Sequence, residues 1–477
     1  MRVPPLWLTV LVFLGLHLIL AGVVPLVEDE AYYTLWATIP SFGYYDHPPM
    51  IAWWIWLGKA VFGHTAFGVR VVSVLGFAAT TVMAWRMTWL ITQDRRAADI
   101  AALFLNATVM MLALGFTATP DAPSTFFWAL TEWAIIEAIY AERAPLSGRW
   151  WLLAGVTAGL GVQSKFTNLF LGVGLVLWLI GSTQGRAELR RPVVWAAAGL
   201  ALLMIAPLGL WNYAHGWVGL GRQFGRVEAQ VFAPGYIADY VLTCIALVTP
   251  VIFWALARGV SRIPRKADVL IWLTAPLVLY MFYHATHDQV QANWLVPLYP
   301  AFAVAAALFA KGLRDRFTFL ASATGLAIGA LAFALAFFPG TAVFPGHNPP
   351  NETKGWTPMI GQVRALKAKT GAAWIATDAY GLTGSLTFYL PDVPVWAMTQ
   401  EQRYIFRGPI PAALCNAPGL LVTTGDPSAQ TLGMFTAHGA PEGLVRRAGT
   451  IALDRYVATP VQGLHGPGAP ACGAPTP

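Results

Sequence analysis

Long apolar runs recur along the first 338 residues and are separated by short polar loops. A run of about 20 apolar residues is long enough to cross a lipid bilayer as a helix. Only 11% of the residues are charged and 57% are hydrophobic, whereas an ordinary soluble domain is about 25% charged. The pattern predicts an all-α polytopic membrane protein. The predicted spans are 6–27, 69–91, 99–117, 123–141, 150–164, 166–182, 193–214, 236–257, 268–284, 294–310 and 318–338.

The charged residues between these runs indicate how the chain is threaded. With the N-terminus in the cytoplasm, most basic residues of the membrane half fall in cytoplasmic loops, as the positive-inside rule requires. The net charge of +7 follows from this bias, and we expect no nucleic-acid partner. The first run lacks a small-residue cleavage site, so we expect it to be retained as a span. Because the number of spans is odd, about eleven, everything after Phe338 then lies outside the cytoplasm.

The composition changes after Phe338, which predicts a small second domain. Residues 339–358 are rich in proline and glycine and are predicted to form a linker. Helical patterns at 359–369 and 380–390 alternate with strand-like runs at 373–377, 420–424 and 444–457. This alternation predicts an α/β domain over 359–462, followed by a disordered tail at 463–477. Cys415 and Cys472 can pair if this end lies outside the cytoplasm.

Acidic, histidine and aromatic residues are concentrated in Glu28–Met50, directly after the first apolar run. A chain this hydrophobic has few places for charge, so charge beside a span indicates a functional site. Asp29 and Glu30 are candidates for a carboxylate that removes a proton from an acceptor hydroxyl, with neighbours that bind a cation. The same acids are also explained as the start of an interfacial helix at 31–38, because negative charge favours a helix N-terminus.

A second cluster, Asp46-His47-Pro48-Pro49, follows in the same loop. The prolines deny the histidine a helical conformation, and an interfacial helix is predicted from Pro49 to Phe62. One interpretation is that Asp46 or His47 caps this helix. The other is that the pair holds a divalent ion or a phosphate in a wet cleft. The sequence does not separate these interpretations.

Further candidates fall on the predicted outer face. Asp121 either caps the fourth span or joins the first loop as a second acid. Lys165 runs against the positive-inside trend, so it either snorkels or binds a lipid phosphate. Arg222 and Arg226 are candidates for the same phosphate. His215 either binds a ligand or belongs to an interfacial aromatic belt.

Several of these residues lie in ordered motifs that resemble a known family. The motifs are DEAYY at 29–33, GYYDHPPM at 43–50, TPDAPSTFFWAL at 119–130, GVQSKFTNLF at 161–170, WNYAHGW at 211–217 and QANWLVPLYPA at 291–301. Together they resemble bacterial GT-C glycosyltransferases of the protein-mannosyltransferase and aminoarabinose-transferase superfamily (glycosyltransferase family 39/83-like). Within it, the motifs are most similar to the lipopolysaccharide galacturonosyltransferase (Rgt-like) branch. The resemblance implies a GT-C transmembrane catalytic domain at 1–338 and a periplasmic α/β domain.

The resemblance also implies an activity. An inverting glycosyltransferase of this kind moves a sugar from a polyprenyl-phosphate donor to a hydroxyl of an envelope acceptor, such as lipid A or lipopolysaccharide core. The reaction would take place at the periplasmic face of the bacterial inner membrane, among membrane lipids. A divalent metal ion is a possible cofactor of such enzymes.

The matched motifs assign residues to these roles. Asp29 matches the catalytic acid of the first loop, with Glu30 beside it, and Asp121 matches the acid of the second loop. Lys165 matches a lysine near the donor phosphate. His47 stands where the aminoarabinose transferases have lysine, which departs from that pattern. The implied metal ligands are Asp46 and His215.

Two other functions remain open. A protein O-mannosyltransferase would use a similar donor and a protein acceptor. A transporter or flippase of lipid-linked sugars would carry its charged groups near mid-membrane on broken helices, often in inverted repeats. The charge predicted here lies at one surface, and the sequence shows no internal repeat.

Overall fold

The computed structural model describes residues 3–141, 144–225, 232–337 and 349–473. The contacts divide the chain into two compact units. The helical unit comprises Met1–Gly22 and Asp46–Leu331, and the C-terminal unit comprises Val23–Tyr45 and Ala332–Pro477. The segment that follows the first apolar run therefore belongs with the C-terminal residues. The sequence placed that segment in a domain spanning 1–338, so the division differs from the predicted boundary.

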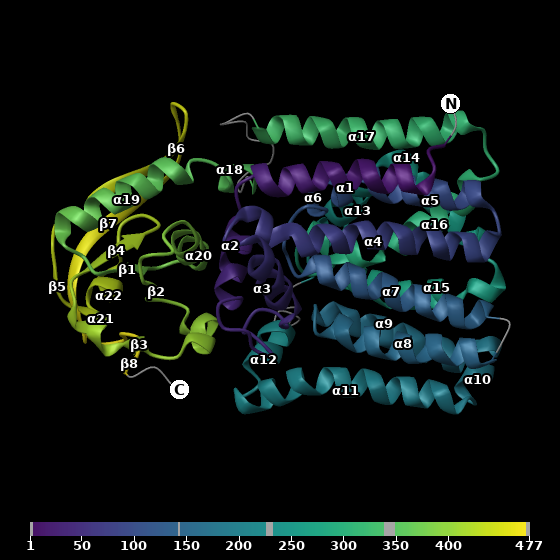
Figure 1. The fold of residues 1–477 in the computed structure, drawn as a ribbon, viewed down its shortest axis with the longest axis horizontal. Coiled ribbons are helices and arrows are strands. Elements are labelled where there is room, and N and C mark those ends of the chain that lie inside the picture. The colour runs from purple at the N-terminus through teal and green to yellow at the C-terminus, as the bar shows by residue number, and fades with distance from the viewer. Residues whose placement is uncertain (1–2, 142–143, 226–231, 338–348, 474–477) are drawn as a thin grey trace. The chain divides into compact units, whose positions relative to one another are not determined.

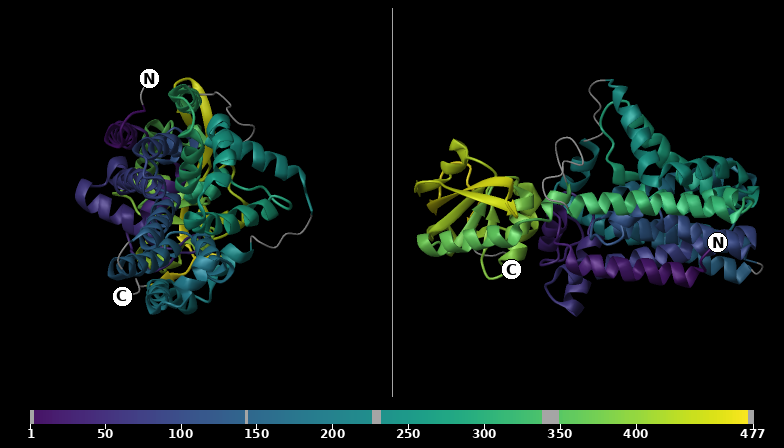
Figure 2. Two further views of the ribbon diagram at one scale, coloured as in Figure 1. Left: turned by 90° about the vertical axis from the view of Figure 1, so that its right-hand side faces the viewer. Right: turned by 90° about the horizontal axis from the view of Figure 1, so that it is seen from above.

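The helical unit consists of long apolar helices that run roughly parallel or antiparallel to one another (Figures 1 and 2). Within the described ranges, five helical segments are long and apolar enough to cross a membrane, or up to seven if each of two bent pairs counts as one. The five segments are α1 (Leu6–Val23), α4 (Ala66–Thr92), α11 (Pro192–Ala214), Asn293–Ala310, which ends in α16 (Tyr299–Ala310), and α17 (Asp315–Phe337). The bent pairs join α9 (Leu169–Gly181) to α10 (Thr183–Leu189) and α13 (Gly235–Val248) to α14 (Pro250–Gly259).

The helical unit also contains helices outside this set. Where the sequence predicts one span at 99–117, the structure has two helices, because the Thr108 side chain caps a new one by accepting a hydrogen bond from Met111 N. The helices of this unit outside the first set include α3 (Met50–Phe62), α5 (Arg95–Asn106), α6 (Val109–Leu114), α7 (Asp121–Tyr140), α8 (Ala144–Val162), α12 (Val218–Phe224), α15 (Val269–His284) and the 3-10 segments η1 (Phe166–Asn168) and η5 (Ala292–Leu298).

Small residues let neighbouring helices of this unit approach closely. A Cβ atom on Gly155 would lie 2.2 Å from Ala197 O, and one on Gly159 would lie 2.6 Å from Ala201 O. Both glycines are on α8 and both alanines are on α11. Close backbone approach through small residues is the usual way that helices associate in a membrane.

The C-terminal unit has a mixed β-sheet with strand order β2-β1-β4-β7-β5, and β6 also pairs with β7. Strand β1 is parallel to β2 and β4, whereas β7 is antiparallel to its three partners. The strands are β1 (Trp374–Thr377), β2 (Val395–Ala397), β3 (Ile410–Pro411), β4 (Gly419–Thr423), β5 (Phe435–His438), β6 (Glu442–Ala448), β7 (Ile451–Leu464) and β8 (Cys472–Gly473). The helices are α2 (Glu28–Trp36), α18 (Pro349–Glu352), α19 (Trp356–Thr370), α20 (Tyr380–Tyr389), η6 (Glu401–Arg407), α21 (Ala412–Asn416) and α22 (Ala429–Leu432).

The central strands β1 and β4 of this sheet are buried on both faces. Successive residues of β1 alternate between two cores: Ile375 packs with the α19 side chains, whereas Trp374 and Ala376 pack with Met434 and Phe435. This alternation is the two-residue period of a strand. Short continuous apolar runs at β1 and β4 are therefore what a strand covered on both sides requires.

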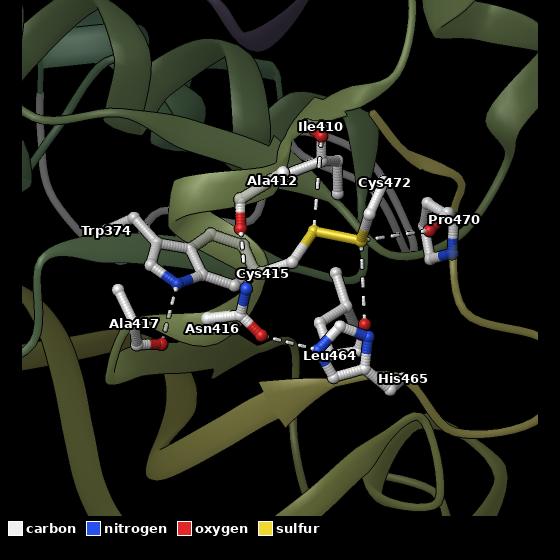
Figure 3. Close-up of a disulfide and its surroundings, with 10 residues drawn as sticks. All are labelled: Trp374, Ile410, Ala412, Cys415, Asn416, Ala417, Leu464, His465, Pro470 and Cys472. Carbon is white, nitrogen blue, oxygen red and sulfur yellow. Dashed lines mark hydrogen bonds between the residues drawn. A yellow bond between two sulfur atoms is a disulfide. The ribbon is translucent and has the colours of Figure 1, made fainter. Parts of the chain in front are cut away.

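The structure differs from the predicted disorder at 463–477. Strand β7 continues to Leu464, and β8 pairs with β3. Cys472 forms a disulfide with Cys415, which confirms a pairing that the sequence allowed (Figure 3). Strand pairing and a covalent link order a segment whose glycine and proline content alone indicates coil. Residues 474–477 lie outside the described residues.

Candidate functional site

The helical unit brings Asp121 and Lys165 together in a buried ion pair. Lys165 Nζ lies 2.7 Å from Asp121 Oδ1, and both side chains are less than a tenth exposed. Asn293 Nδ2 donates a hydrogen bond of 2.7 Å to the other carboxylate oxygen, Oδ2. Hydrogen bonds to ionised groups are short and strong, so the Asp121 carboxylate is fixed from two sides.

Breaks in helical structure place these three side chains. Asp121 is the first residue of α7, and Asn293 lies in the 3-10 segment η5. Lys165 adopts an extended conformation between α8 and η1, with φ −158° and ψ 138°. Asn168 secures this break, because its Nδ2 donates to Ser124 O and its Oδ1 accepts from Ser124 Oγ.

Asp46 is buried and lies near a basic side chain. Its carboxylate is 3.8 Å from Arg222 Nε of α12, and its backbone oxygen accepts a hydrogen bond from Gln223 Nε2. The predicted interfacial helix begins at Met50, as α3, without a side-chain cap. Its N-cap residue is Pro49, so neither Asp46 nor His47 occupies the N-cap position.

The end of the first loop is tied to the Lys165 segment. Met50 N donates a hydrogen bond of 3.0 Å to Gln163 O, two residues before Lys165. Gln163 in turn donates from Nε2 to Met204 O on α11 at 2.8 Å. The GYYDHPPM and GVQSKFTNLF motifs thus meet through the backbone. His47 is half-buried beside this junction in the chain.

His215 has an aromatic environment at the end of α11. Its ring stacks on Trp211, with centroids 4.3 Å apart, and Nδ1 lies 2.8 Å from Trp211 O. Across the described ranges, no group of three or more His, Cys, Asp or Glu side chains is placed to hold a metal ion. Asp46 instead faces Arg222. These donors do not fit the implied metal.

Of the three basic side chains predicted to bind phosphate, the structure describes two. Lys165 and Arg222 each lie beside a carboxylate, as described above. Arg226 falls within 226–231, outside the described residues.

The two candidate acids of the first loop belong to the C-terminal unit, where they have different environments. Glu30 is fully buried, and its Oε2 accepts a hydrogen bond of 3.1 Å from Val27 N at the start of α2. The helix-start interpretation therefore applies to Glu30. Asp29 is exposed, and its Oδ1 accepts a hydrogen bond of 3.1 Å from Tyr380 Oη of α20. Asp29 is the accessible acid of the two.

Two residues of these clusters, Asn293 and Tyr380, were missed by sequence reasoning. Asn293 lies inside the QANWLVPLYPA motif, and a polar residue between apolar neighbours was an available signal. Tyr380 gave no signal, because its partner Asp29 is 351 positions away and a surface tyrosine at a helix start is unremarkable by composition.

Comparisons with known proteins show what this chain is similar to. Residues 46–211 match the family model of Dolichyl-phosphate-mannose-protein mannosyltransferase. Lipid A galacturonosyltransferase RgtD from Rhizobium johnstonii is 26% identical over 389 residues, which cover 76% of this chain and 77% of the relative. An undecaprenyl phosphate-alpha-4-amino-4-deoxy-L-arabinose arabinosyl transferase from Pectobacterium carotovorum is 25% identical over 370 residues, covering 72% of this chain but only 62% of that protein.

Solved structures show the same fold. ArnT from Cupriavidus metallidurans in the apo state aligns with a TM-score of 0.65 at 15% identity, covering 94% of this chain and 97% of ArnT. ArnT bound to undecaprenyl phosphate aligns with a TM-score of 0.62, also at 15% identity, covering 96% and 99%. The fold is therefore that of ArnT, with apolar helices and a C-terminal strand region. In sequence the chain is thus similar to protein mannosyltransferases, a lipid A galacturonosyltransferase and aminoarabinose transferases, and in fold it is similar to ArnT.

Proposed function

We propose that this protein is an inverting glycosyltransferase that moves a sugar from a polyprenyl-phosphate donor to a hydroxyl of an envelope glycolipid, lipid A or lipopolysaccharide core. The observation that carries the proposal is the buried Asp121–Lys165 pair, which joins two of the matched motifs. The names of the relatives support both substrates, because RgtD is named for lipid A and the arabinosyl transferase for undecaprenyl phosphate.

Lys165 is proposed to bind the donor phosphate. A lysine ammonium has three N–H donors, and the structure commits one of them to Asp121. A fixed cation in low-dielectric surroundings stabilises the negative charge that grows on the phosphate as it leaves. The Asp121–Asn293 hydrogen bond holds the counter-ion in place. His47 and Arg222 are proposed to contribute further positive charge or hydrogen bonds to the phosphate.

Asp29 is proposed to be the general base. The acceptor hydroxyl oxygen attacks the anomeric carbon while its proton passes to the Asp29 carboxylate. The bond from the anomeric carbon to the phosphate oxygen breaks, and its electron pair leaves with the polyprenyl phosphate, so the configuration inverts. Glu30 is proposed to act as a positioning residue, since its buried carboxylate fixes the start of α2.

We further propose about eleven spans, with a cytoplasmic N-terminus and the C-terminal α/β domain in the periplasm. The disulfide between Cys415 and Cys472 supports this orientation, because disulfides persist in the periplasm and are rare in the cytoplasm.

The role of Asp29 is tested by Asp29→Asn in protein reconstituted with lipid A and a polyprenyl-phosphate sugar. A general base contributes roughly 100- to 10,000-fold, so we expect transfer, measured by mass spectrometry, to fall at least about 100-fold with thermal unfolding unchanged. Asp392→Asn is the matched control, because Asp392 is an exposed acid of the C-terminal unit that pairs with Arg364. Near-normal turnover of Asp29→Asn would refute the assignment.

The acceptor is tested by mass spectrometry of envelope glycolipids and glycoproteins from cells with and without the gene. A sugar lost from the glycolipids alone supports the proposal and also names the sugar. Loss from proteins alone would overturn the acceptor and favour the protein mannosyltransferase alternative, which the matched family model keeps in view.

A further inference from the structure

The C-terminal unit connects its α/β part to the acid proposed as the base. Tyr380, the first residue of α20, donates a hydrogen bond of 3.1 Å from Oη to Asp29 Oδ1. We propose that Tyr380 is a positioning residue for Asp29, so that the C-terminal α/β part takes a direct share in sugar transfer. The inference rests on the proposed function. It gives a role to residues beyond the family-model match at 46–211.

The packing of α20 on α2 brings the two side chains together. A Cβ atom on Gly384 would lie 2.5 Å from Tyr32 N, and one on Gly381 would lie 2.1 Å from Glu28 Oε2. At Gly384 only glycine permits this approach, because any Cβ atom would collide with the α2 backbone. At Gly381 the nearest atom is the end of the Glu28 side chain. Both glycines follow Tyr380 on the same helix, so their close contact holds the start of α20 against α2.

The Tyr380 ring is held in one orientation. The Tyr32 ring packs edge-on against it, with centroids 5.2 Å apart and an interplanar angle of 69°. The Arg403 guanidinium lies 4.4 Å from the Tyr380 ring centroid, a distance at which a cation is attracted to the ring face. Tyr32 Oη also donates to Arg403 O. The hydroxyl therefore points at Asp29 from a ring fixed by two neighbours.

The surroundings of this contact favour a neutral tyrosine. Burial, followed by the negative charge of Asp29, raises the pKa of the Tyr380 phenol, with Glu28 adding to the rise and Arg403 opposing it. The phenol thus stays protonated and remains a donor. A hydrogen bond to an ionised carboxylate favours the ionised form, which is the form that a general base needs.

The test is Tyr380→Phe in the full-length reconstituted protein, with Tyr389→Phe, the other tyrosine of α20, as the matched control. A hydrogen bond to a charged group is typically worth about 10-fold or more, so we expect kcat to fall about 10-fold with the donor KM unchanged. Without the donor the carboxylate is easier to protonate, so the acid limb of the pH–rate profile should move to higher pH by about one unit. Tyr389→Phe should keep the wild-type profile.

A double variant separates positioning from general structural damage. If Tyr380 acts only through Asp29, adding Tyr380→Phe to Asp29→Asn should not lower the residual rate further. An additional 10-fold loss in the double variant would overturn the inference, as would a wild-type pH profile in Tyr380→Phe. In both of these cases an inactive Asp29→Asn leaves the proposed function standing. An active Asp29→Asn removes the proposed base itself.

Discussion

At the residue scale, the buried pair Asp121–Lys165 affects stability and also has a proposed role in binding the donor phosphate. Two charges taken out of water are stable only with each other and with added hydrogen bonds, and removing one partner leaves the other uncompensated. Asn293 supplies the added hydrogen bond. Stability therefore depends on the pair being complete, whereas the proposed contact with the donor phosphate is made by the lysine of the pair.

This distinction gives a prediction for Lys165→Met. We expect the variant to lose transfer and about 3–5 kcal/mol of stability, because Asp121 keeps a buried charge without its cation. Adding Asp121→Asn should recover most of the stability but none of the activity. Thermal unfolding in detergent and the transfer assay measure the two effects separately. Recovery of transfer in the double variant would show that Lys165 does not bind the phosphate.

The sequence indicated individual residues of the candidate site but not the contacts between them. Asp121 and Lys165 were recognisable because each is a charge beside an apolar run and lies within a motif. Their mutual contact, and the contact of Tyr380 with Asp29, depend on how distant elements pack. A single sequence gives no indication of a hydrogen bond between residues that lie 351 positions apart.

At the element scale, the close approach of α20 to α2 makes Gly384 sensitive to size. Gly384→Ala should destabilise the protein by about 1–3 kcal/mol, since the new methyl group forces the two helices apart. Gly361→Ala on α19 is the matched control, because nothing lies within 4 Å of its Cβ position. Thermal unfolding should separate the two variants, and equal behaviour would contradict the packing described here.

Element types were largely predictable, and element breaks were not. The helix predicted at 380–390 and the strands predicted at 373–377 and 420–424 agree with α20, β1 and β4 within one residue, because period and apolar runs are local signals. The break at Thr108 was missed, since an apolar run hides a capping threonine. The bend of 99° between α13 and α14, which lies inside the span predicted at 236–257, was also missed.

At the scale of the whole molecule, the disulfide gives the proposed orientation a direct test. If the C-terminal domain is periplasmic, a membrane-impermeant thiol reagent should label no cysteine of this domain in intact cells until a reductant is added. Cys472, the exposed partner, should then react. Cys415→Ser is the control that exposes one unpaired thiol without reduction. Absence of labelling after reduction would contradict a periplasmic domain.

The disulfide also predicts a stability effect. It joins residues separated by 57 positions, and closing a loop of that size is worth about 4 kcal/mol in the chain-entropy model. Cys415→Ala combined with Cys472→Ala should therefore lower the unfolding temperature of the C-terminal unit. Transfer at low temperature should persist, because neither cysteine has a proposed chemical role. An unchanged melting profile would mean that the bond adds no stability.

The C-terminal unit is assembled from two pieces of chain, Val23–Tyr45 and the residues after Leu331. The early piece enters the fold by burying Tyr32 and Tyr44 against rings contributed by Tyr380 and Phe406. During synthesis, these aromatic side chains lack their partners until some three hundred intervening residues have been made and inserted. In a protein truncated before residue 349 these side chains would stay exposed. Such fragments should therefore be degraded by proteases and should not be active.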